Sequence, residues 1–149
     1  MSEDVSAQVV EQRVRNRMIE YWEWVSSSTA QSEYQQRVSY VSVSNEAINQ
    51  WEDCQVYESP VGHYRLPVFT EEEAAMLERF NGVWNEVAEA TPDPLPPLEE
   101  LAGNHHWKLL IQESKAAYDL FMIRGKLDED NPIQNKTCHS TSLTRRECT

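Results

Sequence analysis

Glycine is scarce in this chain, with four residues in 149. Phosphate-binding loops need backbone N–H groups presented by tight glycine turns, and the sequence contains neither a P-loop nor a G-x-G-x-x-G pattern. The G-x-S-x-G turn that presents a nucleophilic serine is absent as well. The sequence therefore gives no support to nucleotide binding or to serine hydrolase chemistry, and we expect no enzymatic activity.

Cysteine is also rare. The three cysteines, Cys54, Cys138 and Cys148, are too few and too irregularly spaced for a disulfide framework. Cys138, His139 and Cys148 lie close in sequence, but a structural zinc site needs four ligands and usually begins with a C-x-x-C pair. The sequence therefore predicts no metal site and no cofactor.

Long hydrophobic runs are missing. No apolar segment approaches the roughly 18 residues of a membrane helix, and the first 25 residues lack the apolar region of a signal peptide. We therefore expect a cytoplasmic protein that does not bind membranes. Its 149 residues, 40% of them hydrophobic, are enough for a single domain with its own core.

Basic residues are nearly absent from the middle of the chain. Residues 44–103 contain thirteen acidic residues against Arg65 and Arg79, so they carry −11 of the net charge of −12. Such a field repels nucleic acid phosphates and anionic lipid, and it attracts basic partners. We expect a basic protein partner and no direct binding of nucleic acid.

The first helix is predicted over residues 4–27, with Asp4 as its N-cap. Apolar residues recur at steps of three and four along one face: Val10, Val14, Met18, Trp22 and Val25. Arg17, Tyr21 and Trp24 form a second stripe beside it. Either this helix is buried on two sides, or the second stripe is exposed and offers residue types that are enriched in interface hot spots.

The segment from residue 30 to residue 69 gives mixed signals. Helical spacing favours a helix over residues 30–43, although the segment is rich in β-branched residues. Ser44 is predicted to cap a short helix that ends near Cys54. Residues 54–69 contain two strand-like runs around a Ser-Pro-Val-Gly turn, which is typical of a β-hairpin.

Two further helices have clearer boundaries. Thr70 and Glu73 match the capping-box pattern and predict a helix over residues 70–91, in which Gly82 is a weak point. A proline-rich connector with one turn at residues 98–101 follows. Asn104 is predicted to cap the last helix, and Gly125 to end it in the left-handed conformation.

The predicted fold is mainly α. It is a single domain of four or five helices over residues 1–124, with one small β-hairpin at about residues 54–69 as an optional element. Residues 125–149 contain almost no large apolar side chains, so we expect them to form a mobile polar tail.

The adjacent residues His105 and His106 invite a metal-site interpretation. In the first turn of a helix they are about 100° apart around the axis, so they cannot easily chelate one ion together. The pattern favours a capping or surface role.

The hypothesis that these patterns favour is an acidic protein-binding module. Its most concrete form is a small inhibitor or immunity-type protein that covers the basic surface of a nuclease or another nucleic-acid-handling partner. Two alternatives remain open: a structural or assembly protein that acts through homo-oligomerisation, and a small hydrolase or metal enzyme that uses scattered histidine and glutamate residues. The predicted partner-binding residues are Glu71, Glu72, Glu73, Glu78, Glu86, Glu89, Asp93, Glu99 and Glu100, with Tyr21 and Trp24 as aromatic anchors.

Overall fold

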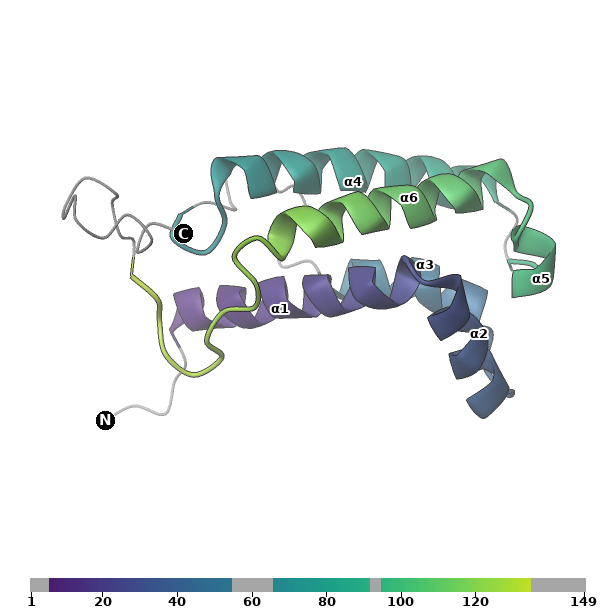
Figure 1. Cartoon of the computed structure of the whole chain (residues 1–149), viewed down its shortest axis with the longest axis horizontal. Helices are drawn as coiled ribbons and strands as arrows, with labels where there is room; N and C mark the ends of the chain where they lie inside the picture. The colour runs from purple at the N-terminus through teal and green to yellow at the C-terminus, as the bar shows by residue number, and fades with distance from the viewer. Residues whose placement is uncertain (1–5, 55–65, 92–94, 135–149) are drawn as a thin grey trace.

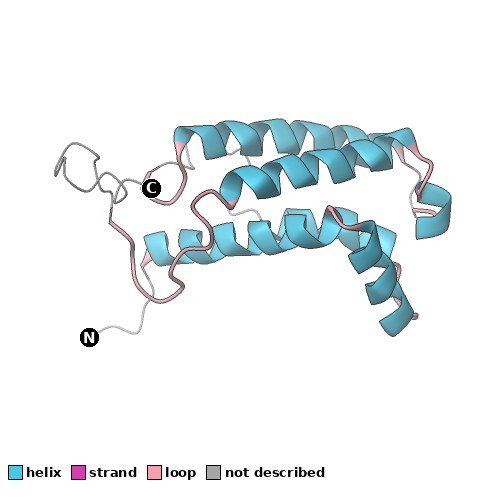
Figure 2. Cartoon of the chain, in the orientation of Figure 1, coloured by secondary structure: helices cyan, strands magenta, loops and turns pink. Residues whose placement is uncertain are grey.

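Helices dominate the part of the chain that the structure describes. The computed structural model describes residues 6–54, 66–91 and 95–134 (Figures 1 and 2). Its helices are α1 (Ala7–Val25), α2 (Ser28–Arg37), α3 (Val43–Cys54), α4 (Glu71–Ala90), α5 (Leu98–Leu101) and α6 (His105–Phe121). No strand occurs within these ranges, and the predicted mainly α fold is confirmed.

The starts of α4 and α6 follow the predicted caps. The Thr70 hydroxyl accepts a hydrogen bond from the Glu73 N–H at 3.0 Å, and the Glu73 carboxylate accepts one from the Thr70 N–H at 3.1 Å. The Asn104 side chain accepts from the Trp107 N–H at 3.0 Å. These side chains satisfy backbone donors that have no partner inside the helix, which is why the helices begin there.

The first helix is shorter than predicted and begins at a different cap. Ser6 accepts a hydrogen bond from the Val9 N–H at 3.1 Å, while Asp4 lies outside the described residues. At the same end of the bundle, after α6, Gly125 has φ +78° and its N–H donates to the Phe121 carbonyl at 3.0 Å. The predicted left-handed conformation of Gly125 is confirmed, but α6 ends earlier than predicted, at Phe121.

The helix predicted over residues 30–43 ends early, at Arg37. The Gln35 amide donates to the Val41 carbonyl at 2.7 Å and accepts from the Val43 N–H at 3.1 Å, so it bridges a turn that leads into α3. Ser44, the predicted cap, lies inside α3 and is buried. A side chain that bonds the backbone across a turn competes with helix continuation, and local spacing alone does not reveal this.

The predicted β-hairpin at residues 54–69 lies mostly outside the described residues, which omit 55–65. At its described ends, Cys54 is the last residue of α3 and residues 66–69 form turns. Neither end contains a strand.

The helices pack as a bundle from which one helix diverges. Figure 1 shows α4 and α6 side by side and antiparallel, α1 on the other side of α6 from α4, and α3 behind α1. The main contacts of α2 are with α1 and α3, and α2 points away from the rest of the bundle. The first helix therefore contacts three others, α6, α3 and α2.

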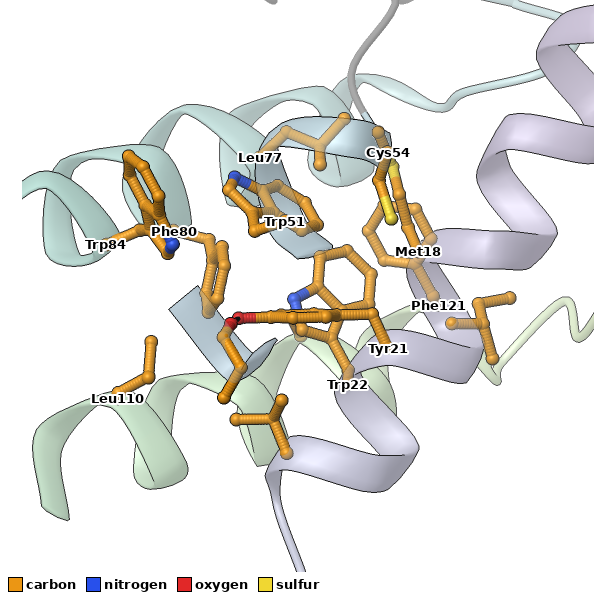
Figure 3. Close-up of a cluster of buried hydrophobic side chains, with 14 of the residues drawn as sticks. Met18, Tyr21, Trp22, Trp51, Cys54, Leu77, Phe80, Trp84, Leu110 and Phe121 are labelled. Atoms are coloured by element: carbon orange, nitrogen blue, oxygen red, sulfur yellow. Dashed lines mark hydrogen bonds between the residues drawn. The ribbon is translucent and has the colours of Figure 1, made fainter. Parts of the chain in front are cut away.

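Aromatic side chains from four helices form the centre of the core (Figure 3). The Trp22 ring lies 5.4 Å from Trp51, 5.7 Å from Phe80 and 4.7 Å from Phe121, measured between ring centroids. Tilted and edge-on aromatic pairs of this kind each contribute about 0.5–1.5 kcal/mol beyond the apolar area that they bury. The predicted apolar stripe of the first helix is buried except for Val10.

Residues 127–133, which follow α6, are hydrogen-bonded to α1. Gln12, on α1, donates to the carbonyls of Asp128 at 2.7 Å and Asn131 at 2.9 Å and accepts from the Ile133 N–H at 2.8 Å. The Asn16 side chain likewise donates to the Leu127 carbonyl at 2.8 Å and accepts from the Leu127 N–H at 2.8 Å. The predicted domain boundary at Gly125 is therefore too early: residues 125–134 belong to the helical body, and residues 135–149 lie outside the described residues.

Candidate functional site

The outward face of α4 carries a series of exposed carboxylates. Leu77, Phe80, Trp84 and Val87 form the buried face. Glu71, Glu78 and Glu89 are separated by seven and eleven residues, which places them on one side of a helix, opposite that face. Glu72, Glu86 and these three residues are all exposed. The helix thus presents acidic side chains along its whole length.

These carboxylates have no basic partner among the described lysines and arginines. The bases near them are engaged elsewhere: Arg79 binds Glu113 at 2.8 Å, and Arg15 and Arg124 bind Glu73. The closest positively chargeable neighbour is His106, whose Nε2 lies 3.8 Å from the Glu86 carboxylate. The acidic face is therefore not neutralised from within the described part of the molecule.

The acidic series continues onto α5. Glu99 and Glu100 are exposed there and form no ion pair with a described lysine or arginine. Asp93 lies outside the described residues. We call Glu71, Glu72, Glu78, Glu86, Glu89, Glu99 and Glu100 the acidic face.

Glu73 does not belong to this face, although the sequence analysis placed it there. Its side chain is 3% exposed, and it binds Arg15 through Nη2 at 2.8 Å and Arg124 through Nη2 at 2.8 Å. Burial alone would raise the pKa of the Glu73 carboxyl, but the hydrogen bonds and charges of the two guanidinium groups lower it overall. Glu73 is thus a charged structural residue.

The two arginines are held by backbone carbonyls as well as by Glu73. Arg15, which is fully buried, also donates to the carbonyls of Gly125 at 2.6 Å and Phe121 at 3.1 Å. Arg124 also donates to the carbonyls of Pro67 and Val68. Buried charges are tolerated when each is paired and hydrogen-bonded, as here. This cluster joins α1, the start of α4, the end of α6 and residues 67–68.

The two predicted aromatic anchors differ in exposure. Tyr21 is 4% exposed, and its hydroxyl donates to the Ala47 carbonyl, so it cannot contact a partner directly. Trp24 is partly exposed and packs edge-on against Tyr34, with ring centroids 5.6 Å apart. The second stripe of the first helix is therefore buried at Tyr21 and accessible at Trp24.

Trp24 is separated from the part of the acidic face that lies on α4. Trp24 lies at the end of α1 and packs against Tyr34 of α2, and Figure 1 shows α1 and α4 on opposite sides of α6. The predicted binding set had placed both in one site. The order of packing, which separates them, cannot be read from the periodicity of single helices.

His105 and His106 occupy the first turn of α6, as predicted. His105 is exposed and His106 is half-buried, with their ring centroids 5.3 Å apart. Within the described ranges, no group of three or more histidine, cysteine, aspartate or glutamate side chains is placed to hold a metal ion. No helix in these ranges combines the length and apolar character needed to cross a membrane.

A groove that no sequence pattern predicts lies between α2 and the α5–α6 corner. Its volume is about 630 Å³, and its walls come from residues 28–36, 98–102 and 107–112. These segments are far apart in the chain and share no motif. No local signal could have found the groove, because it exists only where α2 diverges from α6.

The comparisons with known proteins identify no relative. No protein-family model matches the chain, and no curated protein or solved structure gives a significant match.

Proposed function

We propose that this protein is an acidic protein-binding module. In its most concrete form it is a small inhibitor or immunity-type protein that covers the basic surface of a nuclease or another nucleic-acid-handling protein. The observation that supports the proposal is the acidic face, whose carboxylates have no lysine or arginine partner among the described residues.

The acidic face favours a basic partner because its carboxylates repel one another. From Glu71 to Glu89 the acidic series spans about 27 Å at 1.5 Å per residue. Like charges held along one helix face raise the free energy of the isolated protein, and a partner rich in lysine and arginine lowers it again. Such a surface also increases the rate of encounter with a basic partner, and salt weakens this effect.

The proposed docking surface omits four residues of the predicted set. Glu73 and Tyr21 are buried, and Asp93 lies outside the described residues. Trp24 lies on α1, which Figure 1 shows on the other side of α6 from α4. The docking surface that we propose is therefore the acidic face alone.

A charge-reversal pull-down from lysate of the source cells tests this proposal. Glu78, Glu86 and Glu89 are replaced together by lysine, which changes the net charge by six. The matched control replaces Glu23, Glu33 and Glu52 by lysine. These residues are exposed, lie on α1, α2 and α3, and give the same change in net charge.

We expect the wild-type protein to capture a basic protein at low salt and to lose it as ionic strength rises. The α4 variant should lose this partner, and the control variant should retain it. Retention by the α4 variant would exclude the acidic face as the docking surface. Equal loss in both variants would show that only the total charge matters.

A further inference from the structure

The groove between α2 and the α5–α6 corner has an apolar floor and an amide-rich rim. Leu98, Trp107 and Ile111 contribute the apolar side chains, and all three belong to or border the main core. Gln36 on α2 and Gln112 on α6 are exposed at the rim. A volume of about 630 Å³ lies within the range of ordinary ligand sites.

Two nearly buried side chains of the groove have an unused hydrogen-bonding atom. Gln31, at 2% exposure, donates from Nε2 to the Val25 carbonyl at 2.7 Å, and its Oε1 accepts no hydrogen bond in the described structure. Trp107, also at 2% exposure, has an indole N–H with no described acceptor. Neither atom is among the fully buried atoms without a partner, so each remains partly accessible to solvent. An occupant that covered this acceptor and this donor without bonding to them would incur an unfavourable free energy.

The charge of the groove favours an uncharged occupant. Its lining carries one acidic side chain, Glu99, and one basic side chain, Lys108. Because these two charges cancel, the lining has no net charge to pair with an anionic or a cationic group, and an anionic group would also be repelled by the overall charge of −12. A neutral group meets neither penalty.

We propose that this groove binds an extended, uncharged peptide segment with one apolar side chain. A peptide unit has one carbonyl for the Trp107 N–H and one N–H for the Gln31 Oε1. The rim glutamines, which donate and accept, can bind the flanking peptide units. The apolar side chain lies on Leu98 and Ile111. This site shares Glu99 with the acidic face, but it does not depend on the proposed function.

An NMR titration tests the proposal with a defined probe, the capped peptide acetyl-Gly-Leu-Gly-amide. Backbone and side-chain N–H signals of the full-length protein are followed as the peptide is added. The same titration is run with acetyl-Gly-Arg-Gly-amide, with acetyl-Gly-Glu-Gly-amide, and with isopentanol, which has the branched hydrocarbon but no peptide group.

Two exposed alanines provide matched variants. Ala102 lines the groove, so Ala102→Trp fills it, whereas Ala116 lies on the exposed side of α6 outside it. The leucine peptide should shift the Trp107 indole and Gln31 amide signals to saturation in the wild type and in Ala116→Trp, but not in Ala102→Trp. Gln31→Met, which removes the free acceptor, should weaken binding about fivefold.

Four results would overturn the proposal. They are the absence of saturable shifts at Trp107 and Gln31, unchanged binding by Ala102→Trp, saturation by isopentanol at the same concentration as the peptide, and tighter binding of either charged peptide.

Discussion

Arg15 and Glu73, 58 residues apart in the chain, form an ion pair that is sealed from solvent, with Nη2 and Oε2 2.8 Å apart. The same carboxylate accepts the Thr70 N–H and so also fixes the first turn of α4. A single side chain therefore sets the start of one helix and holds it against another.

We expect Arg15→Met to destabilise the protein by about 3 kcal/mol, because removing one member of a buried ion pair leaves the other member poorly compensated. The contact of the guanidinium with the Phe121 ring, 4.9 Å from its centroid, is lost as well. Urea unfolding at neutral pH measures the change. Lys115→Met is the control: it breaks the exposed pair with Asp119, and exposed pairs contribute about 0–1 kcal/mol. Similar losses in both variants would contradict the assigned role of Arg15.

The ionisation of Glu73 should make stability depend on acid pH. Because the folded state lowers the pKa of Glu73 below the ordinary value of 4.5, its contribution is present above that pH and is lost as the pH falls through the folded-state pKa. Unfolding free energies at pH 7, 5, 4 and 3 should fall more steeply for the wild type than for Glu73→Gln, which has no carboxyl to protonate. Parallel curves for the two proteins would disprove this linkage.

Gly82 and Gly125 should respond to alanine with opposite signs. Gly82 lies inside α4, and an added Cβ meets nothing within 4 Å, so Gly82→Ala should stabilise the protein by about 1 kcal/mol through helix propensity. Gly125 has φ +78°, so Gly125→Ala should destabilise it by about 1–2 kcal/mol. Thermal and urea unfolding of both variants measure the changes. A gain in stability for Gly125→Ala would mean that the backbone there does not need the left-handed conformation.

The contact of residues 125–134 with α1 should depend on Gln12. Gln12→Met removes three hydrogen bonds to this segment, including the one from the Ile133 N–H. Hydrogen exchange of the Ile133 amide should accelerate by about tenfold or more, since it loses its acceptor. Gln50→Met, which alters a side chain bonded within α3 to Glu46, should leave this exchange unchanged. Equal exchange in the wild type and in Gln12→Met would show that the segment is held by other contacts.

Helix boundaries set by local chemistry could be predicted. Thr70 with Glu73 and Asn104 act within one turn of the chain and cap α4 and α6 as predicted. Gly125 has the predicted left-handed conformation, although α6 ends at Phe121. The end of α2 could not be predicted, because the Gln35 side chain forms its bonds across a turn whose shape depends on how α3 docks.

The sequence predicted most of the acidic residues of the candidate site, but not which members of the predicted set are buried. The alternation of Glu71, Glu78 and Glu89 with apolar residues already implies an exposed acidic stripe on one helix. The capping-box position distinguishes Glu73 from Glu71 in the sequence, but it does not reveal the ion pairs that Glu73 forms, because its partners Arg15 and Arg124 are 58 and 51 residues away. The same limitation placed Tyr21 in the binding set and left the groove unseen.

By itself, the sequence determined that the fold is mainly helical, where α4 and α6 begin and which part of the chain is negative, because these properties depend on neighbouring residues and on a repeat of 3.6 residues. Only the tertiary structure decided which acid is buried, which aromatic is accessible and where a groove opens. Those properties depend on which helix packs against which, and such contacts join residues that are far apart in the chain.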